Sequence, residues 1–314
     1  MADLSIYLFW TGLVTAILAA VLYIAFTASA SLGLRRVAAT SAGTVTLSSA
    51  QGVPNMGIGR MATTLTAFTV VALGGTVAAR WAAVEHPPMS NMYEFTVAFG
   101  FAICAAYLAF ERTSHQRRFG TIALPIVVTM LAIATLFPSR ILPLIPALQN
   151  GPLLAIHVSV MMVSYAVLTV AFSGAVIYLV QGGRGLRRFA SLPSPEASEE
   201  FAHRAMMVGT PMLVLGIALG AWWANAAWGR YWGWDPKETS AALVFLSCAA
   251  YFHARAGRGS VAGAAGIRKL VPLRIIRGWR PDPMWWIVIT YGLVMFTYFA
   301  VNLWVSGLHS YAGV

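Results

Sequence analysis

The chain has 314 residues, of which 59% are hydrophobic and only 10% are charged, and its mean hydropathy is +0.72. This composition excludes a soluble globular protein and predicts an all-α polytopic membrane protein. The net charge of +11 does not indicate nucleic-acid binding, because the Lys and Arg residues are confined to the connections between apolar segments.

Eight apolar segments are long enough, or nearly so, to cross the ~30 Å hydrocarbon core of a bilayer. They cover residues 4–26, 61–81, 93–110, 121–137, 153–180, 206–226, 239–254 and 284–305. The first segment lacks the basic stretch and the small-residue cleavage site of a signal peptide, so we expect a retained helix. No region has the composition of a separate soluble domain, which predicts a single transmembrane domain over residues 1–314.

Basic residues predict the orientation of these segments. Seventeen of the 21 Lys and Arg residues lie in the first, third, fifth and seventh connections. Connections enriched in Lys and Arg remain on the cytoplasmic side, so we expect both termini and the connections around His86, Asn150 and Trp228 to face outward. The longest basic segment, residues 255–283, is expected to lie on the inner leaflet as an orientation anchor.

The connection between the sixth and seventh segments has the most distinctive composition. It reads WGRYWGWDPKE from Trp228 to Glu238, and we expect an external loop over residues 227–238. Its aromatic side chains are Trp228, Tyr231, Trp232 and Trp234. Their faces, with glycines between them, suit a planar apolar ligand whose acidic edge could meet Arg230 and Lys237. The pattern favours a porphyrin with propionates, and the alternative is an aromatic belt at headgroup depth.

Two segments carry signals for the start of a helix. Pro236 restricts Asp235 to an extended conformation, and either Asp235 or Glu238 is expected to cap the helix that follows. His86 precedes two prolines that favour an extended loop, and Ser90 and Asn91 are the cap candidates for the next helix.

Three of the six histidines stand out by their depth in the membrane. His157 lies just inside the outer end of the fifth segment, and His309 lies just beyond the outer end of the eighth. Two neutral imidazoles at the level of the tryptophan loop could ligate iron on opposite faces of a porphyrin. His253 lies ~21 Å into the seventh segment on helical rise, where ionisable side chains are usually functional. Hydrogen-bonded or solvated interfacial roles are the alternatives.

The tryptophan loop resembles the signature of the haem-handling membrane protein family. The chain most resembles the CcsA/ResC branch of that family, which serves system II cytochrome c maturation. Three further segments carry the resemblance: HPPMSNMYE at 86–94, GPLLAIHVSVMMVSYA at 151–166 and VNLWVSGLHSY at 301–311. The resemblance implies that haem b is delivered to the outer face of a bacterial plasma membrane. It also implies attachment of haem to the CxxCH thiols of apocytochrome c, together with a ResB/CcsB-type membrane partner.

The resemblance also implies roles for individual residues. The ring of the haem would be held by Trp228, Tyr231, Trp232, Trp234 and Asp235. His157 and His309 would ligate its iron, while His86 would contact haem or apocytochrome. His253 would belong to an inner haem site that the partner completes. Because no base or nucleophile is evident, any catalysis would act by positioning haem and thiols.

Two other classes of function are compatible with the composition. An electron-transfer cytochrome b subunit usually carries paired histidines within its spans, but no segment here contains two histidines. A transporter of haem or another small molecule would be expected to show inverted repeats, and none is clear. Cys104 and Cys248 lie in apolar segments and form neither CxxC nor CxxCH, so the chain has no covalent haem attachment motif of its own.

Overall fold

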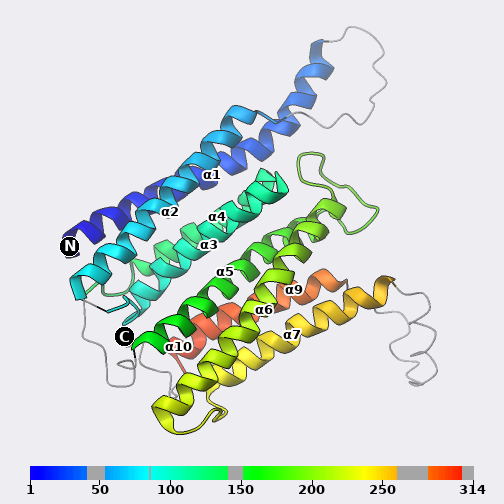
Figure 1. Ribbon diagram of the computed structural model, residues 1–314. Helices are drawn as coiled ribbons and strands as arrows, with labels where there is room; N and C mark the ends of the chain where they lie inside the picture. The colour runs from blue at the N-terminus through cyan, green and yellow to red at the C-terminus, as the bar shows by residue number, and fades with distance from the viewer. Residues whose placement is uncertain (41–53, 85, 141–150, 260–281, 306–314) are drawn as a thin grey trace, which may run out of the picture.

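The computed structural model describes residues 1–40, 54–84, 86–140, 151–259 and 282–305 (Figure 1). These residues form helices and no strand, which confirms the predicted all-α class. In chain order the elements are α1 (Ala2–Thr40), α2 (Met56–Val84), α3 (Met92–Ser114), η1 (Arg117–Phe119), α4 (Gly120–Ala134), α5 (Gly151–Val180), α6 (Pro195–Trp228), α7 (Pro236–Gly259), α9 (Pro283–Met295), η4 (Phe296–Ala300) and α10 (Val301–Leu303).

Each of the eight apolar segments falls largely within a helix. Seven of the described helices are long and apolar enough to cross a membrane, the last of them running through α9, η4 and α10 from Pro283 to Leu303. The remaining helix, α7, has 24 residues and carries charged residues near both of its ends. The chain is therefore a multi-pass membrane protein.

Consecutive helices run antiparallel and pack side by side (Figure 1). α1 packs on α2, and these helices cover α3 and α4. α5 lies at the centre and contacts α3, α4, α6 and α9, while α7 packs mainly on α9. Gly174 allows α5 and α6 to approach closely, because a Cβ there would lie 3.0 Å from the backbone oxygen of Ser198.

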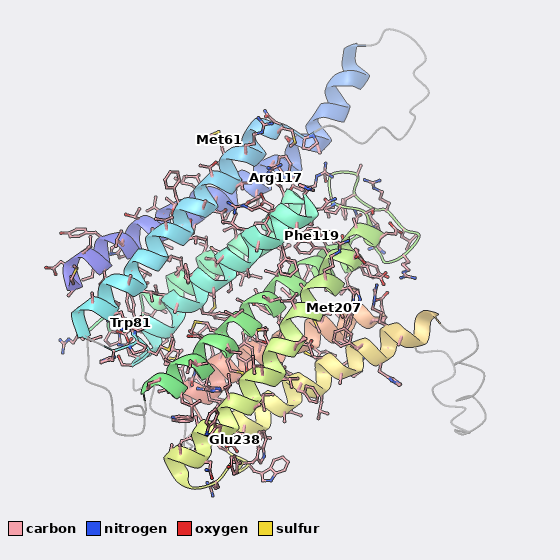
Figure 2. All side chains as sticks on the ribbon, viewed as in Figure 1. Met61, Trp81, Arg117, Phe119, Met207 and Glu238 are labelled. Atoms are coloured by element: carbon pink, nitrogen blue, oxygen red, sulfur yellow. The ribbon has the colours of Figure 1, made fainter. Side chains whose placement is uncertain are left out.

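The connections sort to the two ends of this bundle. The N-terminus lies at the same end as the connection between α6 and α7 (Figure 1). Trp81 and Glu238 mark that end, and Arg117 lies toward the other (Figure 2). Both the tryptophan loop and the segment after His86 therefore lie at one end of the molecule, as the alternation of spans predicts. Only five residues of the basic segment 255–283 belong to α7, which continues to Gly259, and residues 260–281 lie outside the described part.

Buried carboxylates lie near the helix ends and are paired with arginines. The pairs are Glu94 with Arg80, Glu111 with Arg117, and Glu199 with both Arg184 and Arg255. Pairing of this kind offsets the cost of removing a carboxylate from water. These ion pairs fix where helices enter and leave the bundle.

Candidate functional site

The loop between α6 and α7 is shorter than the sequence predicts. α6 continues to Trp228 and ends at Gly229, whose φ of +72° is the left-handed conformation typical of a glycine after a helix. The Gly229 N–H donates to the Asn225 carbonyl at 2.9 Å. Because α7 begins at Pro236, the non-helical loop covers residues 229–235, and the predicted range 227–238 included parts of both helices.

Both carboxylates of the WDPKE sequence close this loop, although the sequence left the choice between them open. Asp235 Oδ1 accepts a hydrogen bond from the Lys237 backbone N–H at 2.9 Å. Glu238 Oε2 accepts from the N–H groups of Asp235 at 3.1 Å and Gly233 at 2.8 Å. This reciprocal capping arrangement satisfies backbone donors at the start of α7 and holds the loop against that helix.

The four predicted aromatic residues divide into two groups. Tyr231 and Trp232 line a cavity beneath the loop, whereas Trp228 and Trp234 are not among its lining residues. Trp234 is 71% exposed and meets the Trp232 ring edge-on, with centroids 5.8 Å apart. Trp228 packs edge-on against Trp223 of α6, with centroids 4.8 Å apart. The aromatic residues therefore form a wall and a rim rather than one continuous face.

The glycine at position 233 serves an internal contact in this structure. A Cβ on Gly233 would lie 2.6 Å from Arg230 Nε, so the missing side chain leaves room for the guanidinium group. Arg230 itself is exposed and does not line the cavity. Of the two cations that the sequence analysis proposed for an acidic ligand edge, only Lys237 faces the cavity.

The cavity has a volume of about 160 Å³ and a mostly apolar wall. Residues from α3, α5, α6, the loop, the start of α7, η4 and α10 contribute to it. This volume is below the roughly 300–1,000 Å³ of pockets that enclose a drug-sized ligand. A planar ring would therefore be held by one edge in the cavity, with the remainder against the exposed aromatic rim formed by Tyr231 and Trp234.

His157 forms the polar centre of the cavity wall. Its Nδ1 lies 2.8 Å from the Gly216 carbonyl oxygen, which can only accept, so Nδ1 carries the proton and Nε2 holds the lone pair of the neutral ring. The imidazole lies parallel to the buried Trp223 ring, at 4° with centroids 6.5 Å apart. A backbone carbonyl that fixes the tautomer in this way is the usual support of a metal-binding histidine.

Lys237 is the only cation among the described residues that line the cavity. Its Nζ donates to Asn302 Oδ1 at 2.7 Å, and Asn302 Nδ2 donates to the Tyr298 carbonyl at 2.6 Å, which orients the amide. Lys237 precedes the span that starts at Thr239. Desolvation lowers the pKa of Lys237 to about 8, and the nearby Asp235 carboxylate partly opposes that shift.

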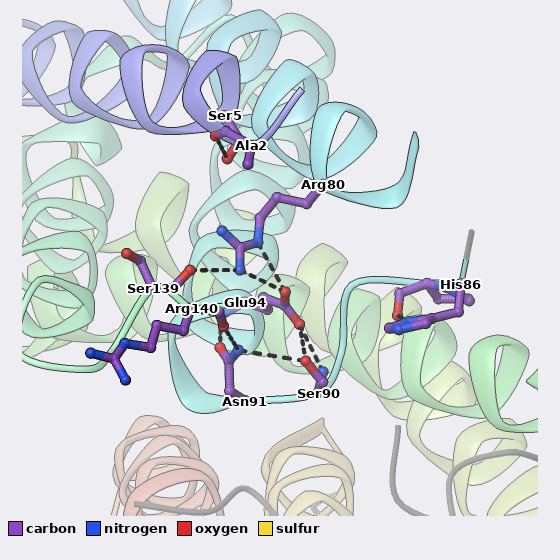
Figure 3. Close-up of polar contacts among 10 residues, drawn as sticks. Ala2, Ser5, Arg80, His86, Ser90, Asn91, Glu94, Ser139 and Arg140 are labelled. Carbon is purple, nitrogen blue, oxygen red and sulfur yellow. Dashed lines mark hydrogen bonds and ion pairs between the residues drawn. The ribbon is translucent and has the colours of Figure 1, made fainter. Parts of the chain in front are cut away.

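The segment after His86 contributes Met89 to the cavity lining, and its polar residues form a cluster at the start of α3. Of the two cap candidates, Ser90 and Asn91, it is Asn91 that caps α3, by accepting from the Glu94 N–H at 2.9 Å. Glu94 also accepts from Ser90 and forms a buried ion pair with Arg80 at 2.8 Å (Figure 3). His86 stands apart from this cluster, with Nδ1 3.0 Å from the Pro87 carbonyl oxygen (Figure 3). It does not line the cavity.

The two remaining candidate histidines do not join His157 in the described structure. His309 lies outside the described residues. His253 is exposed on α7, 16 residues or ~24 Å of helical rise from Lys237. Any ligand held by His253 would therefore occupy a second location, well separated from the cavity.

Several residues of the site were absent from the sequence-based assignments. Trp223 lies within an apolar segment, where an aromatic side chain carries no signal of its own. Tyr298 and Asn302 reach the cavity from η4 and α10, where the last span contains a π-helical turn at Phe296–Ala300. Such turns are common at functional sites but have no reliable sequence signature.

Comparisons with known proteins bear on this arrangement. Residues 89–309 match the family model described as cytochrome C assembly protein. The chain belongs to the cytochrome c assembly protein family. The matched range contains the tryptophan loop, His157, His253 and His309, and it begins three residues after His86.

Curated relatives of this cytochrome c assembly protein carry the name cytochrome c biogenesis protein CcsA. The protein of Guillardia theta is 33% identical over 281 residues, covering 81% of this chain and 85% of the relative. That of Microcystis aeruginosa is 31% identical, covering 81% and 87%. That of Pyropia yezoensis is 29% identical, covering 81% and 88%.

A solved structure shares the fold of this cytochrome c assembly protein. It is named cytochrome c heme lyase CcmF, and the superposition has a TM-score of 0.63 at 17% sequence identity. The match covers 95% of this chain but 46% of the other, so this chain spans less than half the length of that protein. The likeness concerns the arrangement of helices.

Proposed function

We propose that this protein holds haem at the tryptophan-loop end of the bundle and attaches it to apocytochrome c. A role in cytochrome c biogenesis follows from membership of the cytochrome c assembly family. The observation that carries the finer proposal is the His157 imidazole, whose Nδ1 is 2.8 Å from the Gly216 carbonyl and whose ring lines an apolar cavity beneath the loop. That geometry presents a neutral imidazole with a fixed tautomer, which is what a haem ligand requires.

The wall of the cavity supports an aromatic ring as substrate. Trp232, Tyr231 and the buried Trp223 contribute apolar faces, and the rim is extended by exposed Trp234. Asp235 acts indirectly, since it caps α7 and so sets the position of the loop. Trp228 acts through Trp223, against which its ring packs. We propose that His309 supplies the second axial ligand and yields it to the histidine of the CxxCH substrate.

The attachment reaction makes few chemical demands on the chain. Addition of a thiol across a haem vinyl group forms one C–S bond and transfers the thiol proton to the other vinyl carbon. There is no leaving group and no net oxidation, so positioning of the vinyl group and the thiol is the main requirement. The site has the matching character, because its wall is mostly apolar.

We also propose that this chain works together with a membrane partner of the ResB/CcsB type. His253 is exposed on α7, and the orientation expected from the basic residues would put it in the inner half of the membrane, where an ionisable side chain is costly unless it is paired. We propose that the partner covers this face and supplies the second ligand of an inner haem, which then passes to the outer site. We propose that the tryptophan loop faces the outer side of a bacterial plasma membrane, an orientation that the distribution of basic residues supports.

The absorption spectrum of the detergent-purified chain with its ResB/CcsB-type partner tests the proposal. We expect reduced low-spin bands of non-covalently bound haem b, and we expect His157→Ala and His309→Ala to weaken or shift them. His203→Ala is the matched control, because His203 lies on α6 near the opposite end and its Nδ1 is 3.1 Å from the Tyr251 hydroxyl. In both outer-site variants, the yield of holocytochrome should decrease together with the intensity of the haem absorption bands.

The result that contradicts this function is also definite. If the complex contains no haem, the loop is an interfacial aromatic belt. The same conclusion follows if neither His157→Ala nor His309→Ala changes the absorption bands or the yield of holocytochrome. Haem bands that depend on His157 without any holocytochrome formation from a CxxCH substrate would instead support a haem transporter.

A further inference from the structure

Lys237 differs from the arginines that form the ion pairs of this molecule, because its hydrogen-bond partner is a neutral side chain. The described ion pairs engage Arg80, Arg117, Arg184, Arg204 and Arg255, but they do not include Lys237. Its partner is the neutral amide oxygen of Asn302, at 2.7 Å. Because no carboxylate of the described residues forms an ion pair with Lys237, the charge of Asp235 offsets only part of the cost of removing this cation from water.

The carboxylates of Asp235 and Glu238, which are close to Lys237 in the chain, accept hydrogen bonds from backbone N–H groups. Asp235 accepts from the Lys237 N–H, and Glu238 accepts from the N–H groups of Gly233 and Asp235. These bonds hold the acidic oxygens on the loop, while the Lys237 ammonium reaches across to α10. Among the described residues, the protein thus holds the ammonium of a cavity-lining cation by a hydrogen bond to a neutral amide, while Asp235 acts on it only through its charge.

We propose that Lys237, oriented by Asn302, is the anchor for one carboxylate of the ring-shaped substrate and thereby sets which edge of the ring enters the cavity. The inference rests on the proposed haem function. A haem propionate would replace the missing countercharge and gain a charge-assisted hydrogen bond. The opposite, vinyl-bearing edge of the ring would then point away from Lys237, toward the open rim where a thiol can approach.

Asn302 makes this anchor specific for an anion. Its amide is oriented by the bond from Nδ2 to the Tyr298 carbonyl, so Oδ1 faces Lys237. An amide oxygen can hold the ammonium in place without neutralising it. A carboxylate at position 302 would pair with Lys237 and remove the attraction for a ligand, so we expect Asn302→Asp to behave like loss of the lysine.

Binding of haem and of its dimethyl ester to the purified complex tests the anchor. Esterification removes both propionate charges and leaves the ring, the iron and the vinyl groups unchanged. We expect the wild-type complex to bind haem roughly 10- to 100-fold more tightly than the ester, as for a hydrogen bond to a charged group. Lys237→Met should abolish most of this preference. Comparing the ratio of the two affinities between the wild type and the variant cancels the difference in how the two ligands partition into detergent.

Three controls separate the anchor from other causes. Arg230→Met removes an exposed cation from the same loop and should leave the preference unchanged. His157→Ala should weaken both ligands while preserving their ratio. Lys237→Arg retains the charge and should retain the preference for haem. That result would show that position 237 tolerates substitution.

The pH dependence adds an independent readout. Because desolvation lowers the pKa of Lys237 to about 8, the wild-type preference for haem should be present at pH 7 and should shrink as the pH rises to 9.5. The other titratable groups that line the cavity are His157, Glu238, Tyr165, Tyr231 and Tyr298, and the Asp235 carboxylate acts on Lys237 through its charge. Lys237→Arg keeps all of them, so its preference should stay constant with pH if Lys237 is responsible.

The outcomes distinguish this inference from the function on which it rests. If neither ligand binds the wild-type complex, the proposed function fails. If both bind equally, or if the preference survives in Lys237→Met or is lost in Arg230→Met, haem binding stands and the anchor is wrong.

Discussion

At the scale of single residues, the cavity depends on small side chains that leave room for one ring. Gly220 of α6 faces His157, and a Cβ at this position would lie 2.6 Å from the imidazole Cε1. Four residues earlier, Gly216 supplies the carbonyl that binds Nδ1 of the same ring. One turn of α6 therefore both admits the imidazole and determines its tautomer.

A methyl group at position 220 should displace the imidazole without unfolding the helix. Gly→Ala within a helix favours the helical state by about 1 kcal/mol, so loss of haem in Gly220→Ala cannot arise from a weaker helix. Overpacking of this kind costs ~1–3 kcal/mol, which corresponds to roughly 5- to 150-fold in haem affinity. Titration followed by absorption measures it.

Gly292→Ala on α9 is the matched control for this substitution. A Cβ at Gly292 would meet no atom within 4 Å, so haem affinity should be unchanged. Equal haem affinity in Gly220→Ala and wild type would show that the imidazole position in this structure is not the one that binds iron.

At the scale of secondary structure elements, the start of α7 determines the shape of the tryptophan loop. Glu238 receives two backbone N–H groups of the loop, and Asp235 receives one from α7. Trp234, between these contacts, adopts φ of +56°, a left-handed conformation that is uncommon for a non-glycine residue. The capping contacts hold this residue in its strained conformation, which directs its indole outward.

Glu238→Ala should release the loop from α7. Loss of a capping side chain costs about 0.5–2 kcal/mol locally, so amide hydrogen exchange at residues 233–237 should accelerate while exchange within α5 is unchanged. Glu200→Ala provides the comparison, since Glu200 forms an exposed pair with Arg204 on α6. Unchanged exchange in Glu238→Ala would mean that the loop is held by contacts other than these hydrogen bonds.

At the scale of the whole molecule, the bundle has two chemically different ends. The end that carries Arg117, Arg184 and Arg255 is rich in cations, whereas the other end carries the aromatic loop and the cavity. Basic connections remain on the cytoplasmic side. This asymmetry predicts that the cavity opens on the outer face.

Labelling of single cysteines in intact cells tests this orientation. Ser139 and Arg187 are both exposed and lie in connections that alternate across the predicted membrane. An impermeant maleimide should label Ser139→Cys in intact cells, and should label Arg187→Cys only after permeabilisation. The native Cys104 and Cys248 are buried and should contribute little background. The reverse labelling pattern would place the cavity on the cytoplasmic side.

Prediction from sequence succeeded where the signal was local and failed where it was not. The helices follow from runs of apolar residues, and short-range patterns narrowed the cap of α3 to Ser90 or Asn91 and that of α7 to Asp235 or Glu238. The loop boundaries were wrong by a few residues because helices continue into polar sequence when their ends are capped. Trp223 was missed because an aromatic residue inside a span has no distinguishing pattern.

By itself, the sequence determined the class of the protein, the course of its spans and the end of the bundle at which its aromatic loop lies. These properties depend on hydropathy and on residues that are close in the chain. Only the tertiary structure decided that His157 meets the Gly216 carbonyl across 59 positions and that Lys237 meets Asn302 across 65. It also separated Lys237 from Arg230 as the cation of the cavity, because side-chain direction depends on how α6, α7 and α10 pack.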